Sequence, residues 1–153
     1  MERKLAVWCA RVGLVAVISL GVVACGGGDR LSEAEFRDRA EAICKQVEET
    51  NVAQPSDQSD LVRYLEDFLQ VIDGSAEDFH ALRPPEAFQE QWDEYLRLVD
   101  EAVSLLQDFR DRAGDASTVE LLQIAERFET EVERLADRGR VIERDLGLDE
   151  CIN

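Results

Sequence analysis

The chain has few positively charged residues, and that shortage excludes one large class of partners. Its 153 residues include 17 Lys and Arg but 34 Asp and Glu, for a formal net charge of −17. Proteins that bind nucleic acid, or that lie flat on anionic lipid, use a surplus of Lys and Arg to neutralise phosphate. We therefore expect no nucleic acid partner. The simplest consequence of so acidic a surface is solubility.

Histidine is rarer still, because His80 is its only occurrence. It stands three residues after Glu77, and the spacing Glu-x-x-His places a carboxylate and an imidazole on one helix face. Helical di-iron sites carry two such pairs, and a chain with one histidine cannot supply the second. We therefore predict no metal site. His80 is interpreted as a residue in the last turn of a helix, where the helix dipole favours a cation.

The common catalytic motifs are also missing. The sequence contains no Gly-x-Ser-x-Gly nucleophile elbow, no glycine-rich phosphate loop, no cysteine pair at zinc spacing and no Asp-rich calcium loop. Carboxylates recur at Glu126, Glu133 and Asp137, but an arginine directly follows each of them, which is typical of a solvated helix face. The sequence therefore predicts no catalytic residues and no cofactor.

What the chain does have, at its start, is an export signal. Arg3 and Lys4 form a basic beginning, and residues 12–24 form an apolar run without charge. This layout is typical of a signal peptide, and the run is shorter than the roughly 20 residues that a membrane-spanning helix needs. The alternative is an uncleaved helix over residues 5–24, which would bury Arg11 at a cost of about 2.5 kcal/mol or more.

The signal ends at a cysteine in a recognisable context. Val22-Val23-Ala24-Cys25 resembles the lipobox of bacterial lipoproteins, with a branched apolar residue at −3, a small residue at −1 and the modified cysteine at +1. The resemblance implies that residues 1–24 are a cleaved signal peptide and that Cys25 is linked to diacylglycerol. Residues 25–30 are then the lipidated cysteine and a flexible tether. The resemblance places the protein on the extracytoplasmic face of the cell membrane, held by its acyl chains. The alternative is ordinary secretory cleavage that leaves Cys25 as an incidental thiol.

Two cysteines remain for the exported domain. Of the four in the chain, Cys9 leaves with the signal peptide and Cys25 is assigned to lipid, which leaves Cys44 and Cys151. Two cysteines in an exported domain are candidates for a disulfide. Closing a loop of about 100 residues stabilises a fold by roughly 4.7 kcal/mol when calculated from chain entropy. The alternative is a reactive thiol at Cys44, beside Lys45, with Cys151 as its resolving partner.

The rest of the chain has the pattern of four amphipathic helices. Apolar residues recur at alternating steps of four and three, which is a helical period, and no strand-like alternation competes with it. Short links between long amphipathic helices favour antiparallel neighbours. The sequence therefore predicts an all-α fold, an up-down-up-down antiparallel four-helix bundle over residues 31–153. The apolar stripes run from Phe36 to Val47, Leu61 to Leu82, Phe88 to Ala113 and Leu121 to Leu146.

Capping signals mark where three of these helices begin. Ser32 and Ser117 are each followed three residues later by a glutamate, Glu35 and Glu120, and each pair forms the pattern of a capping box. Ser59 is the expected N-cap of the second helix, because serine accepts a hydrogen bond from the first turn. The predicted helix boundaries rest on these signals.

Small residues interrupt the apolar stripes at Ala40, Ser75, Ala102 and Gly139. Stacked at one level, they could leave a ligand cavity among the helices. Small residues more often allow two helices to approach closely, and the sequence alone favours that interpretation.

Four motifs of the mature chain resemble those of small helical lipoproteins of actinobacteria. In order they are AEAIC, LRPPEAF, AGDAS and LGLDEC. Such proteins show a cysteine in the first helix, a Leu-(Arg/Lys)-Pro-Pro junction, a Gly-Asp turn before the last helix and a Leu-Gly-x-x-x-Cys ending. The resemblance covers nearly all of the mature chain. It implies the fold and the location, and it carries no activity.

These observations favour a non-catalytic function at the cell envelope. The leading hypothesis is a lipid-anchored extracytoplasmic helical bundle that serves as an interaction or scaffold module, with the membrane and an envelope protein as partners. One alternative is the binding of a small ligand or a metal ion within the bundle. Another is a thiol-redox or hydrolytic enzyme that uses Cys44.

Overall fold

The computed structural model describes residues 30–50 and 55–151. The predicted signal peptide, the lipidation of Cys25 and most of the tether lie outside these residues. The described residues form helices without any strand, so the all-α prediction is confirmed for them. The elements are the α-helices α1 (Glu33–Glu49), α2 (Gln58–Ala81), α3 (Gln89–Ala113) and α4 (Thr118–Leu146), and the 3-10 helices η1 (Glu86–Phe88) and η2 (Asp149–Cys151).

The first turns of α1 and α4 are held by the two predicted capping boxes. Ser32 and Ser117 accept hydrogen bonds through their side chains from the backbone N–H groups of Glu35 and Glu120. Each glutamate side chain in turn accepts a hydrogen bond from the backbone N–H of its serine. These bonds satisfy donors that would otherwise lack a partner in the first turn of a helix. Both capping predictions are confirmed.

The prediction for the start of α2 is wrong by two residues. Its N-cap is Asp57 and not Ser59, because the Asp57 side chain accepts a hydrogen bond from the backbone N–H of Asp60. Aspartate and serine are nearly equivalent as N-caps, so residue type alone does not decide between two candidates that lie two residues apart.

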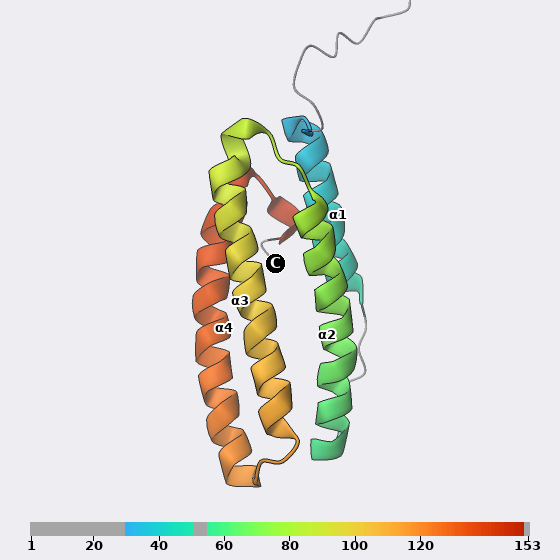
Figure 1. The fold of residues 1–153 in the computed structure, drawn as a ribbon, viewed down its shortest axis with the longest axis vertical. Coiled ribbons are helices and arrows are strands. Elements are labelled where there is room, and N and C mark those ends of the chain that lie inside the picture. Colours follow the sequence, from blue (N-terminus) through green and yellow to red (C-terminus); the bar gives the residue numbers. More distant parts are fainter. Residues whose placement is uncertain (1–29, 51–54, 152–153) are drawn as a thin grey trace, which may run out of the picture.

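The four helices lie side by side along one long axis, and the connections from α2 to α3 and from α3 to α4 lie at opposite ends of it (Figure 1). The helix α3 packs against both α2 and α4, whereas α1 makes its main contacts with α2 and η2. With 17 residues against 29 in α4, α1 is about 26 Å long and α4 about 44 Å. The helix α1 therefore runs beside only the C-terminal part of α2. Its own C-terminal end does not reach the level of the N-terminal end of α2 (Figure 1).

The C-terminal segment folds back onto α1. The helix α4 ends at Gly147, whose φ of 71° lies in the left-handed region that favours glycine. Leu148 behind it is fully buried. The next turn, η2, brings Cys151 to Cys44, and a disulfide bond joins the two with their Cα atoms 5.2 Å apart. The disulfide expected from the cysteine count is thus present.

Two further hydrogen bonds hold this segment against α1. The guanidinium Nε of Arg37 donates to the carbonyl oxygen of Leu146 at 2.7 Å, and the backbone N–H of Asp149 donates to Glu41 Oε1 at 3.0 Å. The same Arg37 side chain would lie 3.1 Å from a Cβ at Gly147, which is a second reason for glycine there. The disulfide and these hydrogen bonds thus hold the end of α4 and η2 against α1.

The core divides into two clusters at opposite ends of the bundle. We call the end that contains α1, η2 and the disulfide the disulfide half, and the end near the α3–α4 connection the hairpin half. Trp92 is central to the disulfide half, edge-on to Phe36 with ring centroids 4.9 Å apart and stacked on Tyr95 at 5.1 Å. The buried residues of the hairpin half are mainly aliphatic: Leu65, Leu69, Leu106, Phe109, Ala113 and Ile124.

None of the helices in the described ranges is both long and apolar enough to cross a membrane.

Candidate functional site

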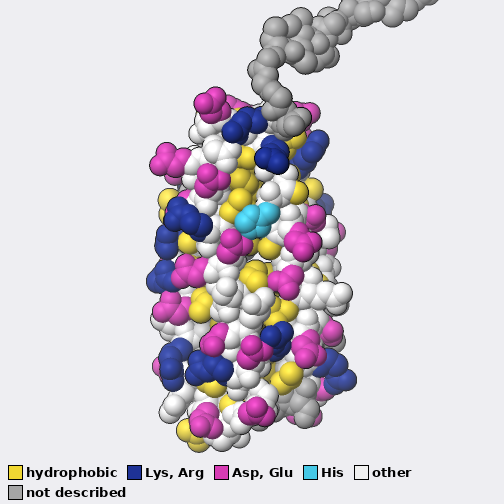
Figure 2. All heavy atoms as spheres, in the orientation of Figure 1, with side chains coloured by type: hydrophobic (Ala, Val, Ile, Leu, Met, Phe, Trp, Pro, Cys, Tyr) yellow, Lys and Arg dark blue, Asp and Glu magenta, His cyan; other side chains and the backbone are white. Residues whose placement is uncertain are grey.

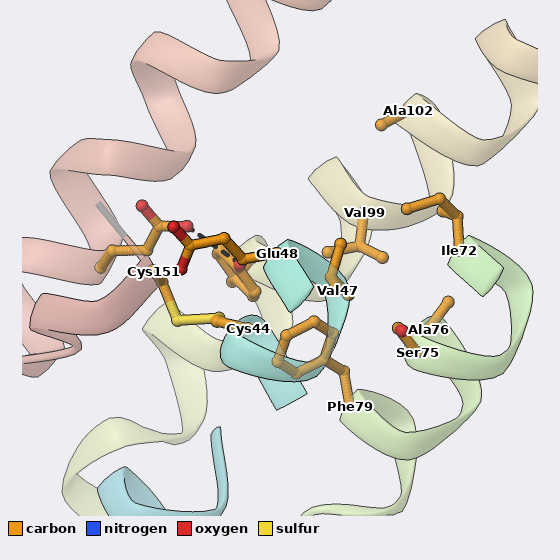
Figure 3. Close-up of a pocket in the computed structure, with 12 residues that line it drawn as sticks. Cys44, Val47, Glu48, Ile72, Ser75, Ala76, Phe79, Val99, Ala102 and Cys151 are labelled. Carbon is orange, nitrogen blue, oxygen red and sulfur yellow. Dashed lines mark hydrogen bonds between the residues drawn. A yellow bond between two sulfur atoms is a disulfide. The ribbon is translucent and has the colours of Figure 1, made fainter. Parts of the chain in front are cut away.

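A cavity of about 470 Å³ lies between the helices where α1 ends. Val47 of α1, Phe79 of α2 and Val99 of α3 face it, and the Cys44–Cys151 disulfide lies along one edge (Figure 3). A volume of this size is within the range of small-molecule sites in proteins, about 300–1,000 Å³. Most of its walls are apolar, as such sites usually are.

Small side chains on two helices account for the open space. Ser75 and Ala76 of α2 and Ala102 of α3 line the cavity (Figure 3). The hydroxyl of Ser75 donates to the backbone carbonyl of Val71 at 3.0 Å, within its own helix. That bond leaves Ser75 without a hydroxyl hydrogen to offer a ligand.

The sequence alone favoured close helix approach at the four small residues, and three of them border open space in the structure. Ser75 and Ala102 line the cavity, and Gly139 lines an adjoining hollow of about 240 Å³ between α3 and α4. Only Ala40 is fully packed, in the aromatic cluster of the disulfide half. The first helix is too short to fill the level at which the other small residues lie, so the gap stays open.

The sequence analysis missed a buried polar group of the cavity, Glu143 of α4. This residue lines the cavity and is only 7% exposed. The hydroxyl of Tyr95 donates to Glu143 Oε1 at 3.0 Å. The other carboxyl oxygen, Oε2, is buried and has no hydrogen-bond partner among the described residues. Because buried polar atoms are nearly always paired, an acceptor without a partner on a cavity wall makes this cavity the candidate functional site.

Burial sets the protonation of this pair. It raises the pKa of Glu143, although the hydrogen bond from Tyr95 and the nearby Arg140 charge act in the opposite direction. Burial and the neighbouring Glu143 carboxylate raise the pKa of Tyr95. Tyr95 is therefore the fixed hydrogen donor of the pair, and Glu143 is the group that can change its charge.

A signal for Glu143 was present in the sequence. Leu135, Gly139 and Glu143 follow one another at steps of four, so they share a helix face. All three are buried. The predicted stripe from Leu121 to Leu146 counted apolar residues and left Glu143 out, because hydrophobic periodicity gives no weight to a carboxylate.

The remaining candidate residues lie on the surface. His80 is exposed, with its Nε2 2.8 Å from Asp100 Oδ1 across the α2–α3 contact, and Glu77 is also exposed. Figure 2 shows the imidazole on the outside of the molecule among charged side chains. Exposed pairs of this kind contribute about 0–1 kcal/mol. The Glu77–His80 motif therefore does not face the interior of the bundle.

The three carboxylates of α4 that were assigned to a solvated face are on the outside, whereas Glu143, which also precedes an arginine, is buried. Glu126, Glu133 and Asp137 are all exposed, which confirms the solvated face. Across the two described ranges, no group of three or more His, Cys, Asp or Glu side chains is arranged to hold a metal ion. The sulfur atoms of Cys44 and Cys151 are both used in the disulfide.

The geometry of the cavity thus brings together one buried acid, one tyrosine hydroxyl and a disulfide in an apolar wall. Hydrogen-bond acceptors and apolar surface are the chemistry it offers. Comparisons of the chain with protein-family models, with curated proteins and with solved structures found no match.

Proposed function

We propose that the protein is a lipid-anchored, extracytoplasmic lipoprotein that binds a small, largely apolar ligand in the interhelical cavity, without catalysis. The observation that carries this proposal is the cavity of about 470 Å³ with the buried Glu143 on its wall. Each methylene group that a ligand buries there would contribute about 0.8 kcal/mol. The apolar walls supply affinity, and the acid supplies orientation.

The location in this proposal comes from the sequence. The lipobox-like residues that end at Cys25 follow an export signal, and a disulfide between Cys44 and Cys151 suits an oxidising compartment outside the cytoplasm. The fold in this proposal is an up-down-up-down antiparallel four-helix bundle over residues 31–153, with residues 25–30 as the tether to the membrane.

The interaction or scaffold module is the second candidate. Val119 and Leu122, in the first two turns of α4, are exposed by 66% and 67%. Two exposed aliphatic side chains in adjacent turns could contribute to contact with an envelope protein. Crosslinking in native membranes followed by mass spectrometry should recover one consistent protein partner under this hypothesis, and recovery of none would count against it.

The experiment that tests ligand binding is native mass spectrometry of the full chain released from its own membrane. The wild-type protein should carry a small-molecule adduct, and Ala102→Phe, which fills the cavity from α3, should lose it. Ser104→Phe is the matched control, because Ser104 is exposed on the same helix. A wild-type protein without any adduct, or an adduct that all three proteins share, would refute this function.

A further inference from the structure

The walls of the cavity offer hydrogen-bond acceptors but no free donor. Two hydroxyl groups line it, and both hydrogens are used: Tyr95 donates to Glu143 Oε1, and Ser75 donates to the carbonyl of Val71. The acceptors are the carboxyl groups of Glu143 and Glu48. A ligand that satisfies this site must therefore bring donors of its own.

The carboxyl group of Glu143 can accept more hydrogen bonds than it does in the structure. A carboxylate can accept about four hydrogen bonds, and this one accepts a single bond, on Oε1, while Oε2 has no partner among the described residues. A buried acceptor in this state favours any ligand that brings a donor to it, since its desolvation is otherwise uncompensated. A donor that is also positively charged forms the stronger bond.

The charges around the cavity are negative, which favours a positively charged ligand group. Its lining includes two glutamates, the buried Glu143 and the exposed Glu48, and no lysine, arginine or histidine. Figure 3 shows Glu48 extending from α1 beside the disulfide, at one edge of the cavity. Arg140 lines the adjoining hollow rather than the cavity itself, and it pairs with the exposed Asp137. A formal net charge of −17 adds a long-range field that attracts cations.

We propose that the cavity selects ligands that join an apolar body to a protonated amine, and that Glu143 is the counterion of the amine. This inference rests on the proposed ligand-binding function and narrows it to one ligand class. The ammonium group donates to the Glu143 carboxylate, and the apolar body fills the space between Phe79, Val99 and Ala102. A ligand with a carboxylate in the same place would meet two acidic side chains and no basic residue in the cavity lining, so the cavity disfavours fatty acids and other apolar anions.

The test uses three probes that share one apolar cage and differ in one group: adamantylamine, adamantanol and adamantane carboxylate. Isothermal titration calorimetry at neutral pH compares them on the full chain in a mild detergent, with a detergent-only titration as the blank. We expect the amine to bind about tenfold or more tightly than the alcohol, because a charge-assisted bond replaces a neutral one. The carboxylate should not bind.

Glu143→Gln removes the charge while keeping the size of the side chain and an oxygen that accepts from Tyr95. It should bind the amine and the alcohol with equal affinity, and binding of the alcohol should be unchanged. Glu133→Gln, on the exposed face of the same helix, is the matched control and should keep the preference for the amine.

The outcomes separate the two levels of the proposal. If none of the three probes binds the wild-type chain, the ligand-binding function itself is refuted. If the alcohol or the carboxylate binds at least as tightly as the amine, the cavity binds ligands but the amine assignment is wrong. A preference for the amine that survives in Glu143→Gln would place the counterion elsewhere and overturn the role of Glu143. The wild-type comparison alone tests the ligand class, whether or not the variant folds.

Discussion

The disulfide half and the hairpin half of the bundle are built on different principles. In the disulfide half, α1 and η2 pack against the long helices, aromatic rings fill the core, and a covalent bond joins residues 107 positions apart. In the hairpin half, α1 has ended, and the clustered core is supplied by α2, α3 and α4 without a cross-link. The cavity lies at the boundary between the disulfide half and the hairpin half. A site can thus arise from the end of one short helix rather than from a dedicated loop.

The largest expected effect comes from breaking the bond that closes the disulfide half. Cys151→Ser should lower the free energy of unfolding by about 4–5 kcal/mol, because it releases a loop of about 100 residues in the unfolded chain. Guanidinium chloride unfolding measures the change. Wild-type protein under reducing conditions should show the same loss. A reduced wild-type protein as stable as the oxidised one would contradict this account.

Trp92 tests the aromatic packing of the same half. It is 1% exposed and contacts Phe36, Phe79 and Tyr95 through its ring. Trp92→Ala should cost about 4 kcal/mol, since a large buried side chain is replaced by a void. Hydrogen exchange should show that amides in α1 lose protection first, because α1 depends on this cluster. Loss of protection confined to the hairpin half would show that the two halves are not distinct.

Leu106 provides the corresponding test in the hairpin half. It is 6% exposed in the aliphatic cluster, and Leu106→Ala should cost about 3 kcal/mol through lost burial and a residual cavity. Leu122→Ala is the control, because Leu122 is 67% exposed and its truncation should change stability by less than about 0.5 kcal/mol. Thermal unfolding of both variants measures the difference. Equal losses in the two variants would mean that the aliphatic cluster does not support this half.

The smallest expected effect is a change in how stability depends on pH, and it concerns Glu143 at the boundary of the halves. Burial raises the pKa of Glu143 in the folded state. The folded protein therefore holds this proton more strongly than the unfolded chain does. Between the unfolded and the folded pKa, this group makes stability fall as pH rises.

Glu143→Gln cannot lose a proton and should remove this contribution. Compared with wild type, the variant should therefore become relatively more stable as pH rises from about 4 toward neutrality. Urea unfolding at a series of pH values measures the difference, with Glu133→Gln as the exposed control. A stability difference between Glu143→Gln and wild type that does not vary with pH would show that Glu143 ionises as freely in the folded state as in the unfolded chain.

The sequence predicted the features that depend on local chemistry. The helices follow from the spacing of apolar residues, and the capping boxes at Ser32 and Ser117 follow from hydrogen bonds within one turn. The prediction that Cys44 pairs with Cys151 required only the cysteine count and the expectation of an export signal. For each of these, the information lies within a short segment or in the composition.

The cavity and its acid depend on how distant segments meet, and sequence periodicity does not carry that information. Whether Ala102 leaves a gap depends on how far α1 extends beside it. Whether Glu143 is buried depends on the rotation of α4 against Tyr95 of α3. The buried face of a helix is wide enough to include both Ile142 and its neighbour Glu143. Helical spacing alone therefore does not tell which of the two residues is buried. For the small residues, too, the spacing alone did not tell whether they leave a cavity or allow two helices to approach closely.

The most direct test of the central claim, that a ligand binds at the boundary of the two halves, is methyl nuclear magnetic resonance. The full chain would be labelled at isoleucine and valine methyl groups and titrated with adamantylamine. The account predicts shifts at Val47, Ile72 and Val99, which line the cavity, and none at Val119 or Ile124, which lie in the hairpin half away from it. Shifts at Val119 and Ile124 without shifts at the cavity residues, or no shifts at any methyl group, would contradict it.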